Sequence, residues 1–122
     1  MELINIETAD CCVESTSLIG NELRIKFEEV YDIEKKDFIK DVELVIYNWT
    51  AFEAKVYNAS APGEPFVEKK LTNDNMEFFE LVQTINKESD HLLLQGFSRE
   101  SGNWLEYHFD KCNFIFKECG DA

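Results

Sequence analysis

The chain has 122 residues, of which 25 are acidic and 12 are basic, so its formal net charge at pH 7 is −13. This excess of carboxylates argues against direct binding of nucleic acid, because affinity for a phosphate backbone comes chiefly from Lys and Arg, and it favours a basic partner. A hydrophobic content of 44% is too high for a disordered chain, and the length predicts a single domain over residues 1–122.

The sequence contains no apolar run near the roughly 18 residues that are needed to cross a bilayer. It opens with Met1-Glu2-Leu3 and has no basic segment of the kind that begins a secretory signal. We therefore expect a cytoplasmic protein that does not bind membranes. An exposed edge strand would allow a weak dimer, and a monomer is the other expectation.

Period-two alternation of apolar and charged residues over residues 22–28 predicts a strand with one wet face. Residues 42–47 are almost continuously apolar, and residues 52–57 alternate again. Because only about three residues separate these two segments, they are predicted to form a hairpin. A loop with both prolines follows at residues 58–65, and a further strand is expected over residues 66–71.

The apolar period changes after Asn73. Phe78, Leu81, Val82 and Ile85 follow the i, i+3, i+4, i+7 spacing that is typical of a helix, so a helix is predicted over residues 75–86. The same residue types also suit strands.

The C-terminal part of the chain has the pattern of two further strands. Residues 91–97 form an apolar segment, and the turn at residues 99–103 contains Gly102, which tolerates positive φ. The partner strand is expected to begin at Trp104, and a change of phase at residues 110–111 indicates a bulge or a short turn. The predicted fold is α+β: a mainly antiparallel sheet with one helix, residues 75–86, packed on it. A closed barrel or a β sandwich is the alternative.

Catalytic and metal-binding patterns are weak in this sequence. The spacing of the four cysteines matches no CxxC pair, so we expect reduced thiols, no metal and no cofactor. The alternative is a zinc site built from His108, Cys112 and Cys119 with either Cys11 or His91. His108 beside Glu106 could support acid/base chemistry, but no recognised catalytic signature surrounds it, so we expect a protein that is not an enzyme.

Two acidic stretches with aromatic residues are candidate partner-binding surfaces, each against the simpler interpretation of a solvated surface. The first follows the alternating strand, and the second lies on the polar face of the last predicted hairpin. The candidate partner-binding residues are Glu28, Glu29, Tyr31, Asp32, Glu34, Trp104, Glu106 and Asp110.

The segment Leu94-Gln95-Gly96-Phe97, followed by a polar turn and then Gly102-Asn103-Trp104-Leu105-Glu106-Tyr107-His108-Phe109, has the form LxGF...GxWxEYxF. It resembles a pattern in the small acidic immunity proteins of bacterial polymorphic toxin systems, including contact-dependent growth inhibition, over about residues 75–117. The resemblance implies a cytosolic protein that binds and blocks one toxin domain, and it carries over no catalytic residues.

The expected function is therefore that of an immunity protein that neutralises a cognate toxin by covering its active or substrate-binding surface. A basic nuclease is the favoured toxin, because nuclease domains are typically cationic and would attract an acidic inhibitor. The alternative is a non-catalytic domain that binds a small ligand or serves in regulation, with aromatic residues lining a pocket.

Overall fold

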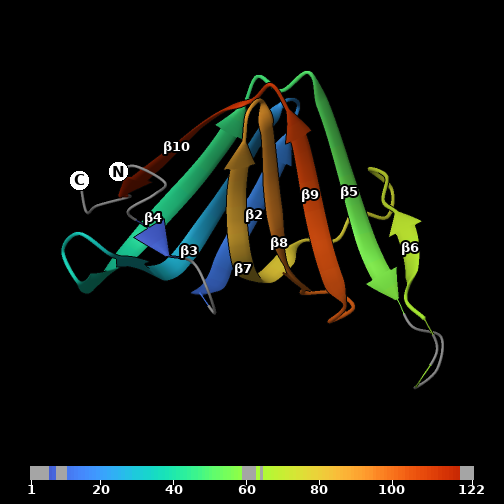
Figure 1. Cartoon of the computed structure of the whole chain (residues 1–122), viewed down its shortest axis with the longest axis horizontal. Helices are drawn as coiled ribbons and strands as arrows, with labels where there is room; N and C mark the ends of the chain where they lie inside the picture. The colour runs from blue at the N-terminus through green and yellow to red at the C-terminus, as the bar shows by residue number, and fades with distance from the viewer. Residues whose placement is uncertain (1–5, 8–10, 59–62, 64, 119–122) are drawn as a thin grey trace.

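The computed structural model describes residues 6–7, 11–58, 63 and 65–118 and contains ten strands in this part of the chain (Figure 1). Every pairing is antiparallel, as expected, and the described residues contain no helix. The strands are β1 (Ile6–Glu7), β2 (Cys11–Ile19), β3 (Glu22–Asp32), β4 (Asp37–Tyr47), β5 (Ala51–Asn58), β6 (Val67–Lys70), β7 (Phe79–Glu88), β8 (His91–Ser98), β9 (Trp104–Asp110) and β10 (Asn113–Glu118).

The strands form one sheet in the order β10-β4-β3-β2-β7-β8-β9-β5-β6, and β1 pairs with β3 beyond the end of β2. Strand β2 joins two halves of the sheet, because it pairs with β7 at Cys11 and Cys12 and with β3 over its remaining length. The two halves enclose one hydrophobic core. Fully buried side chains from both halves include Leu23, Ile25, Phe27, Leu44, Ile46, Leu94, Leu105, Tyr107 and Phe109.

The predicted strands on either side of this core are confirmed. Strand β3 buries Leu23, Ile25 and Phe27 and leaves the intervening residues on the outer face. Strands β8 and β9 form the expected hairpin, and Gly102 in its turn has a φ of 74°. The predicted interruption of the apolar alternation at residues 110–111 is a short turn between β9 and β10.

The predicted α+β fold is wrong, because the described part of the chain is all-β. The predicted helix over residues 75–86 is replaced by β7, which pairs with β8. The register of that pairing shifts twice, once after Phe79 and once after Val82. Each β-bulge adds one residue to one strand, so inward-facing side chains become three residues apart instead of two. Phe79 and Val82 are fully buried and Ile85 packs against the core, so the inward residues are three apart. Of the four residues that predicted the helix, Val82 and Ile85 belong to this inward set, whereas Phe78 precedes the strand.

The predicted hairpin over residues 42–57 is also wrong. Strand β4 lies between β3 and β10, whereas β5 lies between β9 and β6, so residues 48–50 cross from one half of the sheet to the other. The backbone N–H of Thr50 donates a hydrogen bond of 2.9 Å to the carbonyl of Asp110, which joins this crossover to the end of β9. Trp49 closes the core beneath it, with ring centroids 5.1 Å from Phe109 and 5.4 Å from Phe52.

Candidate functional site

The first predicted surface lies on the β3–β4 hairpin in one half of the sheet. Tyr31 and Phe38 face each other across this hairpin with ring centroids 5.2 Å apart, and Phe38 is 55% exposed. Glu28 and Glu34 are exposed, and Glu29 is half-buried. This hairpin therefore offers the expected combination of carboxylates and an aromatic anchor, and Phe38 is a member of it that the sequence analysis missed.

Asp32 does not belong to that surface, so its prediction as a partner-binding residue is corrected. Its side chain is buried, and its carboxylate accepts a hydrogen bond of 3.0 Å from the backbone N–H of Lys35. Strand β3 continues to Asp32 instead of ending before the acidic stretch, which turns this residue toward the interior. Asp32 thus stabilises the hairpin turn.

The second predicted surface lies in the other half of the sheet, on the outer face of β9. Leu105, Tyr107 and Phe109 point into the core, so Trp104, Glu106, His108 and Asp110 point outward, as alternation predicts. Strands β2, β7 and β8 separate β9 from β3 in the sheet, so the structure does not bring the two predicted surfaces together.

Glu106 is the centre of a hydrogen-bonded cluster on this outer face, where its side chain is only 13% exposed. One carboxylate oxygen accepts from the Tyr57 hydroxyl at 3.1 Å and lies 3.0 Å from Nε2 of His108. The other accepts from Nε2 of Gln95 at 2.7 Å and from Nε1 of Trp104 at 3.1 Å. Burial raises the pKa of Glu106, but these hydrogen bonds together outweigh it and keep the pKa below its usual value. Glu106 is therefore an ionised group with its acceptor positions filled.

An open aromatic groove of about 610 Å³ adjoins Glu106. Phe66 is 71% exposed and Phe97 is 43% exposed, and Phe97 meets Trp104 edge-to-face with ring centroids 5.3 Å apart. We call this feature the aromatic groove; it is lined by Tyr57, Phe66, Phe97, Gly102, Asn103, Trp104 and Glu106.

Sequence analysis predicted Trp104 and Glu106 in this region but missed Tyr57, Phe66 and Phe97. Phe97 did carry a signal, because it has the same parity in β8 as the polar residues His91 and Gln95 and must face outward with them. Tyr57 and Phe66 carried none, since only the pairing of β5 with β9 places Tyr57 opposite Trp104.

Asp110 lies at the opposite end of β9 from Trp104, outside the aromatic groove. Its carboxylate is 2.9 Å from Nδ1 of His91. Nε2 of His91 is in turn 3.2 Å from Nδ1 of His108, which completes a chain of contacts from Asp110 through both histidines to Glu106. We call His91 and His108 the histidine pair.

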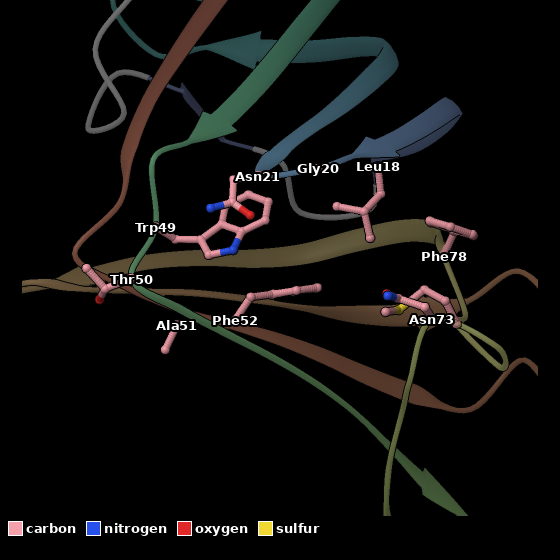
Figure 2. Close-up of a pocket in the computed structure, with 10 residues that line it drawn as sticks. Leu18, Gly20, Asn21, Trp49, Thr50, Ala51, Phe52, Asn73 and Phe78 are labelled. Atoms are coloured by element: carbon pink, nitrogen blue, oxygen red, sulfur yellow. The ribbon is translucent and has the colours of Figure 1, made fainter.

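A second hollow of about 560 Å³ lies where the β4–β5 crossover faces the β2–β3 turn and the segment before β7 (Figure 2). Trp49 extends into it from the crossover and Phe52 from the start of β5, and Leu18 lies across from them. Its polar side chains are those of Asn21, Thr50 and Asn73, and no ionisable residue lines it. Such a lining suits a neutral ligand and provides no acid/base group.

The thiols form no zinc site with His108 in the described part of the chain, where no three His, Cys, Asp or Glu side chains gather as metal ligands. Cys11 is buried and Cys12 is exposed, as expected for neighbours in a strand. Burial raises the pKa of the Cys112 thiol, which disfavours the thiolate that zinc requires. Cys119 lies outside the described residues.

Comparison of the chain with protein-family models, curated proteins and solved structures gives no match. The described residues also include no helix long and apolar enough to cross a membrane. The features that bear on function are therefore the geometry and charge of the outer face of strands β5, β8 and β9.

Proposed function

We propose that this protein is a cytoplasmic immunity protein that binds a cognate toxin domain and blocks its active or substrate-binding surface. The observation that carries the proposal is the aromatic groove, in which exposed Phe66 and Phe97 and half-buried Tyr57 and Trp104 surround an ionised carboxylate, on a chain with a net charge of −13. The resemblance of about residues 75–117 to immunity proteins supports the same conclusion. Neither direct binding of nucleic acid nor catalysis is part of the proposal.

The groove has the composition of a binding hot spot. Trp and Tyr are enriched among residues that dominate binding energy, and a surrounding polar rim excludes water from them. Phe66 and Phe97 expose apolar surface that a partner would remove from water, which is the main source of affinity at such a site.

Glu106 has a different role from the aromatic residues. Because its carboxylate already accepts four hydrogen-bond contacts, it has little capacity to bond a partner directly. It instead holds the Trp104 indole and the Tyr57 ring in fixed orientations, and it contributes negative potential beneath them. A Lys or Arg side chain of a basic toxin would be attracted both by this potential and by the faces of the rings.

A small-ligand domain is the second candidate, and the hollow in Figure 2 is the observation that favours it. The two candidates place the functional residues in different parts of the molecule. Trp49 and Phe52 would contact a ligand, whereas Phe97 and Trp104 would contact a toxin.

The proposal is tested by capture from a lysate of the native organism, with the full chain as bait. We expect wild-type protein to retain one basic protein at low salt, and Trp104→Ala or Phe97→Ala to weaken its binding. Loss of a hot-spot residue costs about 2 kcal/mol or more, which corresponds to about a 30-fold rise in Kd. The purified partner should then arrest growth when expressed alone in a host and permit growth when co-expressed with the wild-type chain.

Phe38→Ala is the matched control, because Phe38 is an exposed aromatic residue outside the aromatic groove. If Phe38→Ala weakened binding and the groove variants did not, the interface would lie on the β3–β4 hairpin. A captured partner without toxicity would contradict the immunity function itself.

A further inference from the structure

The histidine pair has a feature that partner binding does not explain. Strands β8 and β9 place Leu93 opposite His108 and His91 opposite Asp110, so the two imidazoles lie diagonally on the outer face. Their ring centroids are 5.3 Å apart, and Nε2 of His91 is 3.2 Å from Nδ1 of His108. Each ring therefore directs one nitrogen toward the other ring.

The remaining nitrogen of each ring contacts a carboxylate. Nδ1 of His91 is 2.9 Å from Asp110, and Nε2 of His108 is 3.0 Å from Glu106. An ionised carboxylate only accepts hydrogen bonds, so both of these outer nitrogens carry the hydrogen. A neutral imidazole has a single N–H, which leaves a lone pair on each of the two inner nitrogens. Two lone pairs at this distance repel each other unless a proton or a metal ion lies between them, and the surrounding carboxylates would stabilise either.

We propose that His91 and His108 bind one divalent transition-metal ion of the zinc class between Nε2 of His91 and Nδ1 of His108. Two Zn–N bonds of about 2.0–2.1 Å at a tetrahedral angle separate their nitrogens by about 3.3–3.4 Å. The observed separation of 3.2 Å is close to this spacing. Asp110 and Glu106 would then orient the two ligands, since histidine ligands commonly donate their second N–H to a carboxylate.

The charges around the pair favour a cation. Glu88 is the register partner of His91 on β7, and Asp110 and Glu106 contact the two rings directly. Glu53, the register partner of His108 on β5, adds less because it already forms ion pairs with Lys55 and Lys70. Lys87 donates to the carbonyl of Ser89.

The described part of the chain offers no third protein ligand, so water or a donor from a bound molecule would fill the other positions. The side chain of His91 is 40% exposed and that of His108 is 25% exposed, so an ion can reach both from solvent. We therefore expect reversible binding at one ion per chain.

The test is calorimetric titration of the full chain, free of any polyhistidine tag, with Zn²⁺ and then with Co²⁺. We expect one ion per chain and perturbation of the ring signals of both histidines in NMR spectra, which are simple to assign because the chain has only two histidines. His91→Gln should weaken binding at least tenfold. Asp110→Ala, which leaves both ligands in place, should weaken it about 10–100-fold.

Cys12→Ser is the matched control, because Cys12 is an exposed thiol that could bind zinc independently. Unchanged affinity in Cys12→Ser, together with no thiolate-to-cobalt charge-transfer band, would support the histidine pair as the site.

The proposal is overturned if His91→Gln binds as tightly as the wild type. It is also overturned if excess Zn²⁺ leaves the ring signals unmoved, since the inner nitrogens would then share only a proton. Circular dichroism of each variant verifies that it is folded.

Discussion

Two adjacent residues of β9 show how one strand separates polar from apolar chemistry. Glu106 faces outward and is kept ionised by its hydrogen-bond donors. Tyr107 faces inward, is fully buried, and donates its hydroxyl to the backbone carbonyl of Glu77. Burial raises the pKa of Tyr107, and the nearby Glu100 and Glu77 raise it further. Alternation along the strand therefore places a negative charge outside and a buried phenol with a raised pKa inside.

Tyr107 should make the fold sensitive to alkali. Below the unfolded-state pKa of about 10, both states hold the phenolic proton, so its contribution to stability is fully present. Above that pH the unfolded chain releases the proton and the folded chain keeps it, so the free energy of unfolding falls by about 1.4 kcal/mol per pH unit. Urea titrations between pH 8 and about pH 11 measure this slope.

Tyr107→Phe should reduce the slope, while lowering stability at neutral pH by about 1–3 kcal/mol because the carbonyl of Glu77 loses its donor. Tyr47→Phe, a half-buried tyrosine on β4, is the control. An unchanged slope in Tyr107→Phe would show that other groups cause the alkaline transition.

At the scale of elements, the bulges of β7 decide both its curvature and its contacts with β8. Between the two bulges the β7 backbone lies against Gly96, the register partner of Val82. A Cβ atom built on Gly96 would lie 2.0 Å from the carbonyl oxygen of Leu81 and 3.0 Å from the Cα atom of Val82. Gly96 therefore permits a close approach of two backbones that any other residue would prevent.

Gly96→Ala should accordingly destabilise the protein by about 3 kcal/mol or more, because overpacking against backbone atoms forces the strands apart. Gly102→Ala is the comparison. A Cβ atom built on Gly102 would meet no atom within 4 Å, so only the backbone φ of 74° opposes this substitution. That strain costs about 1–2 kcal/mol. Midpoints of urea unfolding rank the two variants. Equal loss in both would mean that β7 can move away from β8 without penalty.

At the scale of the whole molecule, the net charge of −13 acts over a longer range than the aromatic groove. Charges outside the contact act mainly on the association rate, through the field of the whole protein, whereas buried anchors set the dissociation rate. Glu28, Glu29 and Glu34 lie in the half of the sheet that does not contain the groove. Under the proposed function, the carboxylates of the β3–β4 hairpin attract the toxin from a distance, and the residues of the aromatic groove contact it.

Replacement of Glu28, Glu29 and Glu34 by Lys should slow association with the proposed toxin about tenfold at low salt and leave dissociation unchanged. The Gln triple variant, which removes half as much charge, should have an intermediate rate. At about 1 M salt, where the screening length is about 3 Å, the three proteins should associate at similar rates. Surface plasmon resonance measures both rates. A faster dissociation of the Lys variant would place these residues in direct contact with the partner.

Local pattern predicted most of the strands and the faces that they present. The alternation of Leu23, Ile25 and Phe27, and the Gly102 turn before Trp104, are properties of neighbouring residues and were confirmed. The helix was mistaken because two bulges in β7 give buried residues a spacing of three, and a bulge depends on the partner strand. The hairpin over residues 42–57 was mistaken because a three-residue connection can equally cross between the halves of a sheet.

The sequence by itself determined the charge, the outward parity of Trp104, Glu106 and Asp110, and the apolar faces of most strands, because each depends on residue type and on a period of two. Only the tertiary structure decided which outward residues meet. The pairing of β5 with β9 brings Tyr57 to Trp104, and the pairing of β8 with β9 brings His91 to His108. These contacts join residues far apart in the chain, and their register follows from how the whole sheet buries its core.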